Sequence, residues 1–352
     1  MPGLPPTELA GSQTPPKLTV DSVAASEIEQ LASDWRELEL RAQNVNLYST
    51  FDWLSAWATV YQPKRLLLIR IVADADGLIA LGLVELSRLR GWRFAGGPVT
   101  SCRSLLCATG REDAAWRALA KWLGENPLAW STLEASEVPR SAESIPGAHV
   151  SANVTPMLAI PESWDSYLAS LSSKRRADVR RRLRLTDSAN LEVREVPTSD
   201  QEGALDDFLR LHHLRTEFKG ERHPDIDRRL TRLLAILACD SSVRVSLVEI
   251  RRAGVRVAVR ISLEYQRVLY LYNHGWDPEL ASLAPGIVLA LNSIEEAVDR
   301  KLSVIDMGAG EHSYKMGLGA VAERRFALEA SNPRTWARVV RSAYATYARV
   351  RP

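Results

Sequence analysis

The stretch VRVSLVEIRRAGVRVAVRISLEYQRVLYLYN, residues 243–273, decides the fold class of this chain. It consists of three apolar runs in succession, and Ala253-Gly254 supplies a turn between the first and the second. In the middle run, apolar residues occupy every second position from Val255 to Leu263, with Arg256 and Arg260 among the residues between them. Such alternation predicts an antiparallel meander of strands with one covered face.

Helical and extended patterns alternate around this meander. In the second half we expect helices at 164–171, 174–186, 202–219, 226–239, 286–300 and 336–349, and further strands at 191–196, 303–307 and 324–330. In the first half we expect helices around 28–38 and at 51–61 and 113–124, with strands at 65–73, 78–87, 91–99, 131–135 and 156–160. Both halves run from helices to a meander, a helix and final strands, which predicts an α/β (α+β) protein with a duplicated unit.

Domain boundaries follow from this duplication. Residues 1–19 contain five prolines together with Gly, Ser and Thr, so we expect a flexible leader there. The joint between the two units falls near 143–155. The expected domains are therefore 20–150 and 151–335, followed by a C-terminal helix at 336–352.

Composition and charge argue against several classes of protein. The 352 residues are 46% hydrophobic and 25% charged, as in globular proteins, and a net charge of +2 demands no polyanionic partner. No apolar run approaches the roughly 18 residues that span a membrane, and the N-terminus lacks the pattern of a signal peptide. Cys102, Cys107 and Cys239 fit no zinc pattern. We therefore expect a cytoplasmic protein with reduced thiols and no bound metal.

A first candidate site is YLYNHGWDPELASLAPG, residues 270–286. A strand ends there in Asn273-His274, a polar loop follows, and a helix begins at Pro285-Gly286. Pro costs no hydrogen bond at a helix start, and Gly lets a ligand approach the backbone closely. Free N–H groups at such a start bind phosphate, so 282–287 is a candidate pyrophosphate seat, with an ordinary strand-to-helix loop as the alternative.

A second candidate site is DMGAGEHSYK, residues 306–315. A short apolar strand runs into two glycines and then into a dense set of ionisable and hydroxyl groups. That density beyond the end of a strand is typical of a functional site, and a polar surface loop is the alternative.

A third feature is the basic segment 174–184, in which seven of the eleven residues are Lys or Arg. No aromatic residues interleave with these charges, so base stacking has no platform. We expect a solvated or phosphate-facing helix rather than a reader of nucleic acid, which makes a nucleic-acid partner unlikely.

Three stretches of the second half resemble the GNAT-fold acetyltransferases of the CelD/BcsL type, also described as FemAB-like tandem GNAT proteins. They are LSSKRRADVRRRLRL at 171–185, LHHLRTEFKG at 211–220, and the run from Tyr272 to Gly319. The most specific pieces of that run are Pro285-Gly286, Asp306, Gly310-Glu311 and Tyr314-Lys315. The resemblance covers about 155–328 well and the first half more loosely, through FDWLSAWATVY and the hairpin after it.

The resemblance implies two tandem GNAT-like domains, each a mixed, mostly antiparallel sheet flanked by helices, with the first domain degenerate. It implies transfer of an acetyl or longer acyl group from CoA, or from an acyl carrier protein, to an amine or hydroxyl. The acceptor would be a small molecule, a saccharide or a peptide. The phosphate loop departs from the family's usual Arg/Gln-x-x-Gly-x-Gly/Ala form and reads Ser282-Leu-Ala-Pro-Gly.

The same resemblance suggests roles for individual residues. The residues expected to bind acyl-CoA are Tyr272, Asn273, Ser282, Ala284, Pro285, Gly286 and Ile287. His274 would be the general base, with Asp306 or Glu311 as the rival. Tyr314 would protonate the leaving thiolate, and Lys315 would pair with one of those carboxylates or hold a substrate anion.

Two other functions remain open from the sequence. The chain could be a non-catalytic scaffold of the same fold in a polysaccharide or metabolite pathway. It could also be a FemAB-like transferase that takes its acyl group from aminoacyl-tRNA, in which case the basic helix at 174–184 would hold RNA. Binding of acyl-CoA or of tRNA separates these alternatives from the acyltransferase.

Overall fold

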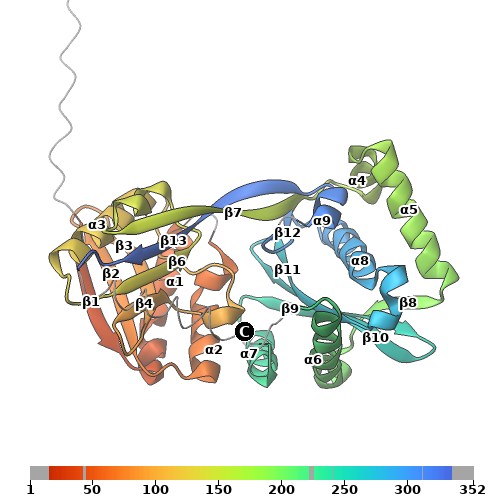
Figure 1. Cartoon of the computed structure of the whole chain (residues 1–352), viewed down its shortest axis with the longest axis horizontal. Coiled ribbons are helices and arrows are strands. Elements are labelled where there is room, and N and C mark those ends of the chain that lie inside the picture. Colours follow the sequence, from red (N-terminus) through yellow and green to blue (C-terminus); the bar gives the residue numbers. More distant parts are fainter. Residues whose placement is uncertain (1–15, 43–44, 222–225, 240, 311, 335–352) are drawn as a thin grey trace, which may run out of the picture.

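The computed structural model describes residues 16–42, 45–221, 226–239, 241–310 and 312–334. Within them the chain forms one 13-stranded sheet flanked by helices (Figure 1). Its strands are β1 (Lys17–Val23), β2 (Leu66–Ala73), β3 (Gly77–Leu86), β4 (Gly91–Phe94), β5 (Leu106–Cys107), β6 (Thr132–Ser136), β7 (Ala148–Ala159), β8 (Leu191–Glu195), β9 (Arg244–Arg252), β10 (Val255–Tyr265), β11 (Val268–Trp276), β12 (Val304–Asp306) and β13 (Val321–Ser331). The α/β fold class expected from the sequence is confirmed.

Helices connect these strands and cover both faces of the sheet. They are α1 (Ala32–Arg41), α2 (Phe51–Tyr61), α3 (Glu112–Glu125), α4 (Trp164–Ser170), α5 (Ser173–Ser188), α6 (Gln201–Phe218), α7 (Arg228–Cys239), α8 (Pro285–Asp299) and α9 (Ser313–Gly317). Short 3-10 turns include η2 (Leu47–Ser49), η3 (Gly97–Val99), η4 (Arg140–Ser144) and η6 (Pro278–Leu283). The strand expected at 91–99 ends at Phe94, and β1 begins at Lys17, within the expected leader. The helix expected at 336–352 lies outside the described residues.

The two halves of the chain share strands. The order is β1-β2-β3-β4-β6-β13-β7-β12-β11-β10-β9-β8, so the last strand lies in the middle of the sheet. Strand β7 pairs with β13 along most of its length and with β12 through Met157–Ala159. Strand β13 in turn pairs with β6 of the first half. The segment expected to join two separate units is therefore part of the sheet itself.

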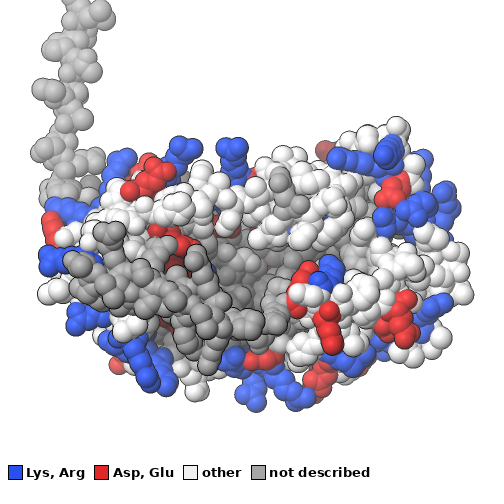
Figure 2. Space-filling view, in the orientation of Figure 1, with Lys and Arg blue, Asp and Glu red and all other residues white. Residues whose placement is uncertain are grey.

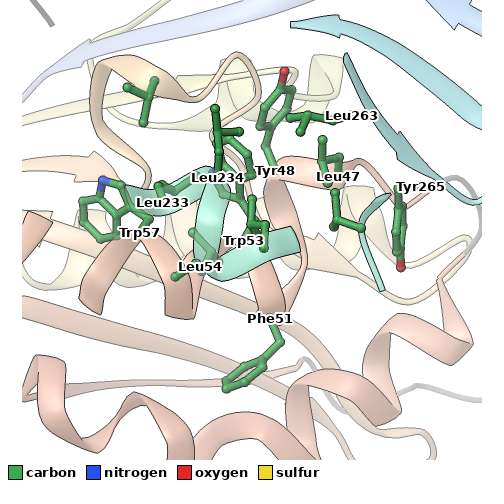
Figure 3. Packing of buried hydrophobic residues seen from close by; sticks show 14 of the residues in the cluster. Leu47, Tyr48, Phe51, Trp53, Leu54, Trp57, Leu233, Leu234, Leu263 and Tyr265 are labelled. Carbon is green, nitrogen blue, oxygen red and sulfur yellow. The ribbon is translucent and has the colours of Figure 1, made fainter. Parts of the chain in front are cut away.

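A single hydrophobic core runs along one face of both halves. It joins α1 and α2 of the first half to α6, α7, β10 and β11 of the second half. Trp53 and Trp57 of α2 are fully buried beside Leu233 and Leu234 of α7 (Figure 3). The opposite face carries separate cores, one beneath α3 in the first half and others beneath α4, α5 and α8 in the second. The halves are thus packed against each other as one body.

The expectation that the meander has only one covered face is wrong. Along β10, Arg260 and Ser262 are as deeply buried as their apolar neighbours, because α8 packs over them. Arg260 donates hydrogen bonds to the Leu289 carbonyl and the Asn292 side chain of α8, and it forms an ion pair with Glu296 at 2.7 Å. A buried charge is tolerated there because the helix supplies acceptors for it.

A second buried ionic cluster ties the outer strands to α6. Glu249 of β9 is 0% exposed and accepts hydrogen bonds from Arg194 at 2.7 Å and Arg251 at 2.8 Å, as well as from Arg256. Arg256 also donates to Asp207 of α6 at 2.6 Å. Burial alone would raise the pKa of Glu249, but hydrogen bonds from the three guanidinium groups outweigh it and the pKa is lowered.

We predict that Glu249→Gln lowers the free energy of unfolding by about 3 kcal/mol, because it leaves the buried Arg256 and the partly exposed Arg194 and Arg251 without their shared carboxylate. Glu192→Gln on the neighbouring strand β8 is the control, since that side chain is exposed, and it should cost less than about 0.5 kcal/mol. Urea denaturation measures both. The pKa of Glu249 is lower in the folded protein than its reference value of 4.5, so ionised Glu249 stabilises the fold above pH 4.5 and this stabilisation is lost as the pH falls. The difference in stability between Glu249→Gln and the wild type should therefore shrink in acid. Equal stability of the two variants at pH 7 would contradict this.

Candidate functional site

The candidate site begins where two parallel strands separate. Strands β11 and β12 pair only through Val268–Tyr270 and Val304–Asp306. Beyond Asp306 the chain turns into a glycine loop, whereas β11 continues to Trp276. Strand β11 also carries a bulge, since Leu271 and Asn273 pair with consecutive residues of β10 and leave Tyr272 as an extra residue. Beyond Tyr270 and Asp306 the two strands no longer pair, and we call the region between β11 and the loop after β12 the opening.

The N-terminus of α8 lies beside this opening. Its N-cap residue Ala284 has a φ of +50° and offers no side-chain acceptor to the helix. The Ile287 N–H donates to the Ala284 carbonyl, while no backbone acceptor for the Gly286 N–H occurs in the described part of the chain. Pro285 has no N–H. The backbone of this turn was expected to bind phosphate. Among the N–H groups of Ala284, Gly286 and Ile287, that of Gly286 is therefore the donor available to an anion.

His274 faces this helix start. A Cβ placed on Gly286 would lie 3.1 Å from His274 Nε2 and 3.6 Å from the indole nitrogen of Trp276. The bulge at Tyr272 explains this orientation, since it turns His274 to the opposite side of the strand from Tyr270. The sequence predicted that His274 lies next to the acyl carbon of the donor. In the structure the His274 ring lies against the N-terminus of α8.

Burial lowers the pKa of His274 to about 3. The positive charges of Arg215, on α6, and of Lys219, at the C-terminal end of that helix, lower the pKa further. The imidazole is therefore neutral at physiological pH and has little affinity for a proton. Arg215 is also within electrostatic range of Tyr314, so its guanidinium lies near the opening between β11 and α9. The sequence analysis missed Arg215 and Lys219, although both lie in the stretch LHHLRTEFKG that carries part of the resemblance.

The side chains of Tyr272 and Asn273, also expected to bind acyl-CoA, form hydrogen bonds within the protein. The Tyr272 hydroxyl donates to the Val99 carbonyl of the first half at 2.8 Å, so this side chain joins the two halves. The Asn273 side-chain oxygen accepts from the His274 N–H at 2.8 Å and shapes the bulge. Ser282 lies in η6, next to the α8 start.

Lys315 organises the loop after β12. Its Nζ donates to the carbonyl oxygens of Gly308 and Ala309, both at 2.9 Å, and to no carboxylate among the described residues. Burial lowers the pKa of Lys315 to about 8. The Asp306 side chain accepts from the Gly308 N–H at 2.8 Å, and burial raises its pKa. Glu311 lies outside the described residues.

Tyr314 completes the expected cluster. It is half-buried on α9, and its ring stacks on His312 with centroids 6.2 Å apart. Burial raises its pKa, while Arg215 acts in the opposite direction. Asp306, Tyr314 and Lys315 therefore surround one loop, and His274 and Gly286 meet at α8 on the other side of the opening.

A small pocket of about 50 Å3 lies on the side of Asp306 that faces the first half. Its polar lining comes from distant parts of the chain, and includes Tyr48, Glu137, Asp306 and Arg325. Sequence reasoning missed Tyr48, Glu137 and Arg325, because no motif links η2, the turn after β6 and β13. Only the strand order brings them to Asp306.

The described residues contain no cluster of three or more His, Cys, Asp or Glu side chains that could hold a metal ion. In the same part of the chain, no helix combines the length and apolar character needed to cross a membrane.

Comparison with known proteins agrees with this architecture. Residues 173–316 match the family model described as Acetyltransferase (GNAT) domain. FemX is 11% identical in sequence, with a TM-score of 0.59 over 84% of this chain and 95% of its own. The C-terminal domain (DUF2156) of a putative lysylphosphatidylglycerol synthetase from Agrobacterium fabrum is 9% identical, with a TM-score of 0.57 over 91% of this chain and 96% of its own. A tandem GNAT protein from the clavulanic acid biosynthesis pathway is 12% identical, with a TM-score of 0.52 over 91% and 100%.

At such identities the solved structures show a shared fold and nothing more. No curated protein sequence matches the chain. Residues 173–316 therefore resemble a GNAT acetyltransferase domain, and the chain shares its fold with tandem GNAT structures.

We predict that the imidazole of His274 does not titrate between pH 5 and 8, because burial and the neighbouring cations hold its pKa near 3. Nitrogen-detected NMR of the histidine side chains, assigned with a His274→Gln variant, measures this directly. A midpoint for His274 within that range would contradict the burial described here and would restore it as a candidate base.

Proposed function

We propose that this chain is an acyltransferase that moves an acetyl or longer acyl group from a CoA thioester to an amine or hydroxyl. The observation that supports this most is the opening beside β11. It has an anion-binding helix start at one end and the buried carboxyl of Asp306 at the other. A thioester and an acceptor can meet there from opposite sides.

The donor side has the features that a CoA pyrophosphate requires. The Gly286 N–H lies in the first turn of the 15-residue helix α8, whose dipole favours an anion, and that turn contains no acidic residue. Arg215 and Lys219 add positive charge close to His274 and hence to Gly286. These residues replace the usual glycine-rich phosphate loop that the sequence lacks.

The acceptor side supplies a base. Asp306 has a raised pKa, whereas His274 has a strongly lowered one, so the carboxylate is the better proton acceptor near neutral pH. In the proposed reaction the acceptor loses its proton to Asp306, its heteroatom attacks the thioester carbon, and the carbon–sulfur bond breaks. Tyr314 protonates the departing thiolate. A backbone N–H of β11 would stabilise the oxyanion.

We predict that Gly286→Val abolishes stabilisation of the protein by acyl-CoA while the chain still folds. A side chain there would press on His274 and cover the free N–H, since even a Cβ lies 3.1 Å from the ring. Thermal shift with acetyl-CoA and longer acyl-CoAs measures binding, and a ligand at 100 times its Kd stabilises a protein by about 2.7 kcal/mol.

Gly124→Val on α3 is the matched control, because a Cβ there has only an ordinary contact of 3.8 Å with Pro146. Unchanged acyl-CoA binding in Gly286→Val would exclude this seat. Absence of a shift in the wild-type protein with every acyl-CoA would instead favour a carrier-protein donor or a non-catalytic scaffold.

We also predict one acyl-CoA per chain. The first half has its own parallel pair, β4 and β6, with α3 between them, which corresponds to β11, α8 and β12. However, the first turn of α3 carries Glu112 and Asp113, which repel a phosphate. Isothermal titration with acetyl-CoA should give a stoichiometry of one, and a value of two would show that the first half binds as well.

A second candidate function rests on α5. Lys174, Arg175, Arg180 and Arg184 are exposed and form no ion pair within the described part of the chain, and Figure 2 shows Lys and Arg side chains gathered over this helix. Such a surface favours a polyanion, which would support aminoacyl-tRNA as the acyl donor. Tight tRNA binding that weakens steeply with salt, together with no response to acyl-CoA, would favour this alternative.

A further inference from the structure

The pocket beside Asp306 brings charged residues of both halves together. Glu137, which follows β6, and Tyr48 of η2 come from the first half, whereas Asp306 ends β12 of the second. Arg325 comes from β13, which pairs with strands of both halves. The proposed base of the second half therefore shares a pocket with a carboxylate of the first half and a guanidinium of the crossing strand.

Glu137 is held in one position by its backbone and its side chain. Its φ is +57°, a left-handed conformation that residues other than glycine adopt rarely. Strand β6 ends just before it, and the Val138 N–H after it donates to the Phe326 carbonyl of β13. Its carboxylate accepts from Arg325 at 2.9 Å and from Asn46 at 3.2 Å. An uncommon backbone conformation that is fixed on every side is typical of a functional position.

Arg325 is shared between two carboxylates. It forms ion pairs with Glu137 at 2.9 Å and with Glu323 of the same strand at 2.6 Å. The Glu137 side chain is 16% exposed and that of Arg325 27%, so solvent screens their charges incompletely. Because both residues line the pocket with Asp306, its carboxyl lies close to one negative and one positive charge.

The other ionisable groups near this carboxyl are mostly uncharged. Among the described residues they are Tyr48, Cys102, Tyr270 and Lys315. Burial raises the pKa of the two tyrosines and of the cysteine, so all three are neutral at physiological pH. The ammonium of Lys315 is the exception, and the loop after β12 holds it through two backbone carbonyls.

Glu137 and Arg325 act on Asp306 in opposite directions. Burial raises the pKa of Asp306, and the hydrogen bond from the Gly308 N–H lowers it. Of the charged neighbours, Glu137 raises this pKa, whereas Arg325 and Lys315 lower it. A second negative charge nearby opposes ionisation of a carboxyl, and a positive charge favours it.

We propose that the Glu137–Arg325 pair controls the protonation of Asp306, so that the first half of the chain adjusts the base of the second. The inference rests on the proposed acyl transfer and adds two positioning residues to its site. Glu137 strengthens Asp306 as a proton acceptor, both by its own charge and by occupying Arg325. A base works best when it accepts a proton close to the pH of the reaction, and this is the property that the pair adjusts.

The test measures the titration of Asp306 in the full chain, without donor or acceptor. Carbon-detected NMR of the side-chain carboxyl groups, assigned with Asp306→Asn, gives its midpoint. We expect Glu137→Gln to lower this midpoint, because it removes a negative charge and leaves Arg325 less neutralised. Arg325→Gln should raise the midpoint, because it removes the positive charge and leaves Glu137 without its cation.

The opposite signs separate an effect of charge from a disturbance of the pocket, which would move the midpoint in one direction in both variants. The double variant Glu137→Gln/Arg325→Gln should titrate between the two single variants. Glu134→Gln is the matched control, because that carboxylate lies on the same segment as Glu137 but outside the pocket, in an exposed pair with Arg93. It should leave the midpoint of Asp306 unchanged.

Shifts of the same sign in Glu137→Gln and Arg325→Gln, or no shift in either, would overturn the proposal. If one of them does not fold, Glu323→Gln decides in its place, since the Glu323 side chain is 53% exposed. That variant also leaves Arg325 less neutralised, so it should lower the midpoint of Asp306. An unchanged midpoint in Glu323→Gln would then contradict the role of Arg325.

A parallel titration with acetyl-CoA separates this inference from the proposed function. Opposite shifts of the Asp306 midpoint without acetyl-CoA binding would leave the control of Asp306 in place and remove the CoA donor. Acetyl-CoA binding with an unmoved midpoint in every variant would remove the role of the pair and leave the acyltransferase.

Discussion

The contact between α2 and α7 is the constraint on which the rest of this structure depends. Trp53, Trp57 and their neighbours bury large aromatic surfaces against leucines of the other half, and each such side chain contributes about 1.5–3 kcal/mol when fully buried. The same core fixes η2, where Tyr270 of β11 accepts a hydrogen bond from the Leu47 N–H at 3.3 Å. It therefore sets the distance between Tyr48 and the end of β12, and with it the geometry of the pocket at Asp306.

The shared strands explain why ionisable side chains from both halves lie close together near Asp306. Strand β13 leaves the second half to pair with β6, and β7 pairs with both β13 and β12. The crossing brings Arg325 and Thr155 beside Asp306, next to the place where β11 and β12 separate. The first half contributes Tyr48 and Glu137 to the pocket at Asp306, and the first turn of its own helix α3 carries acidic residues.

Much of the fold could be predicted from the sequence, because local patterns determine it. The alternation in β10 and the Pro285-Gly286 helix start both gave the correct elements. The orientation of His274 could not be predicted, since a one-residue bulge at Tyr272 reverses which face a strand residue occupies and leaves no trace in the alternation. The burial of Arg260 was missed for a related reason, because its acceptors lie on α8. Glu137 and Tyr48 meet Asp306 only through the long-range strand order, which local patterns do not encode.

The central claim is that donor and acceptor meet across the opening between β11 and the loop after β12. A crystal structure with an unreactive acetyl-CoA analogue, in which the thioester sulfur is replaced by a methylene group, tests this most directly. The account predicts that the pyrophosphate lies on the Gly286 N–H and that the acetyl carbonyl lies between β11 and Gly308, on the side that opens toward Asp306. A pyrophosphate bound at α3, or an acetyl group remote from Asp306, would contradict it.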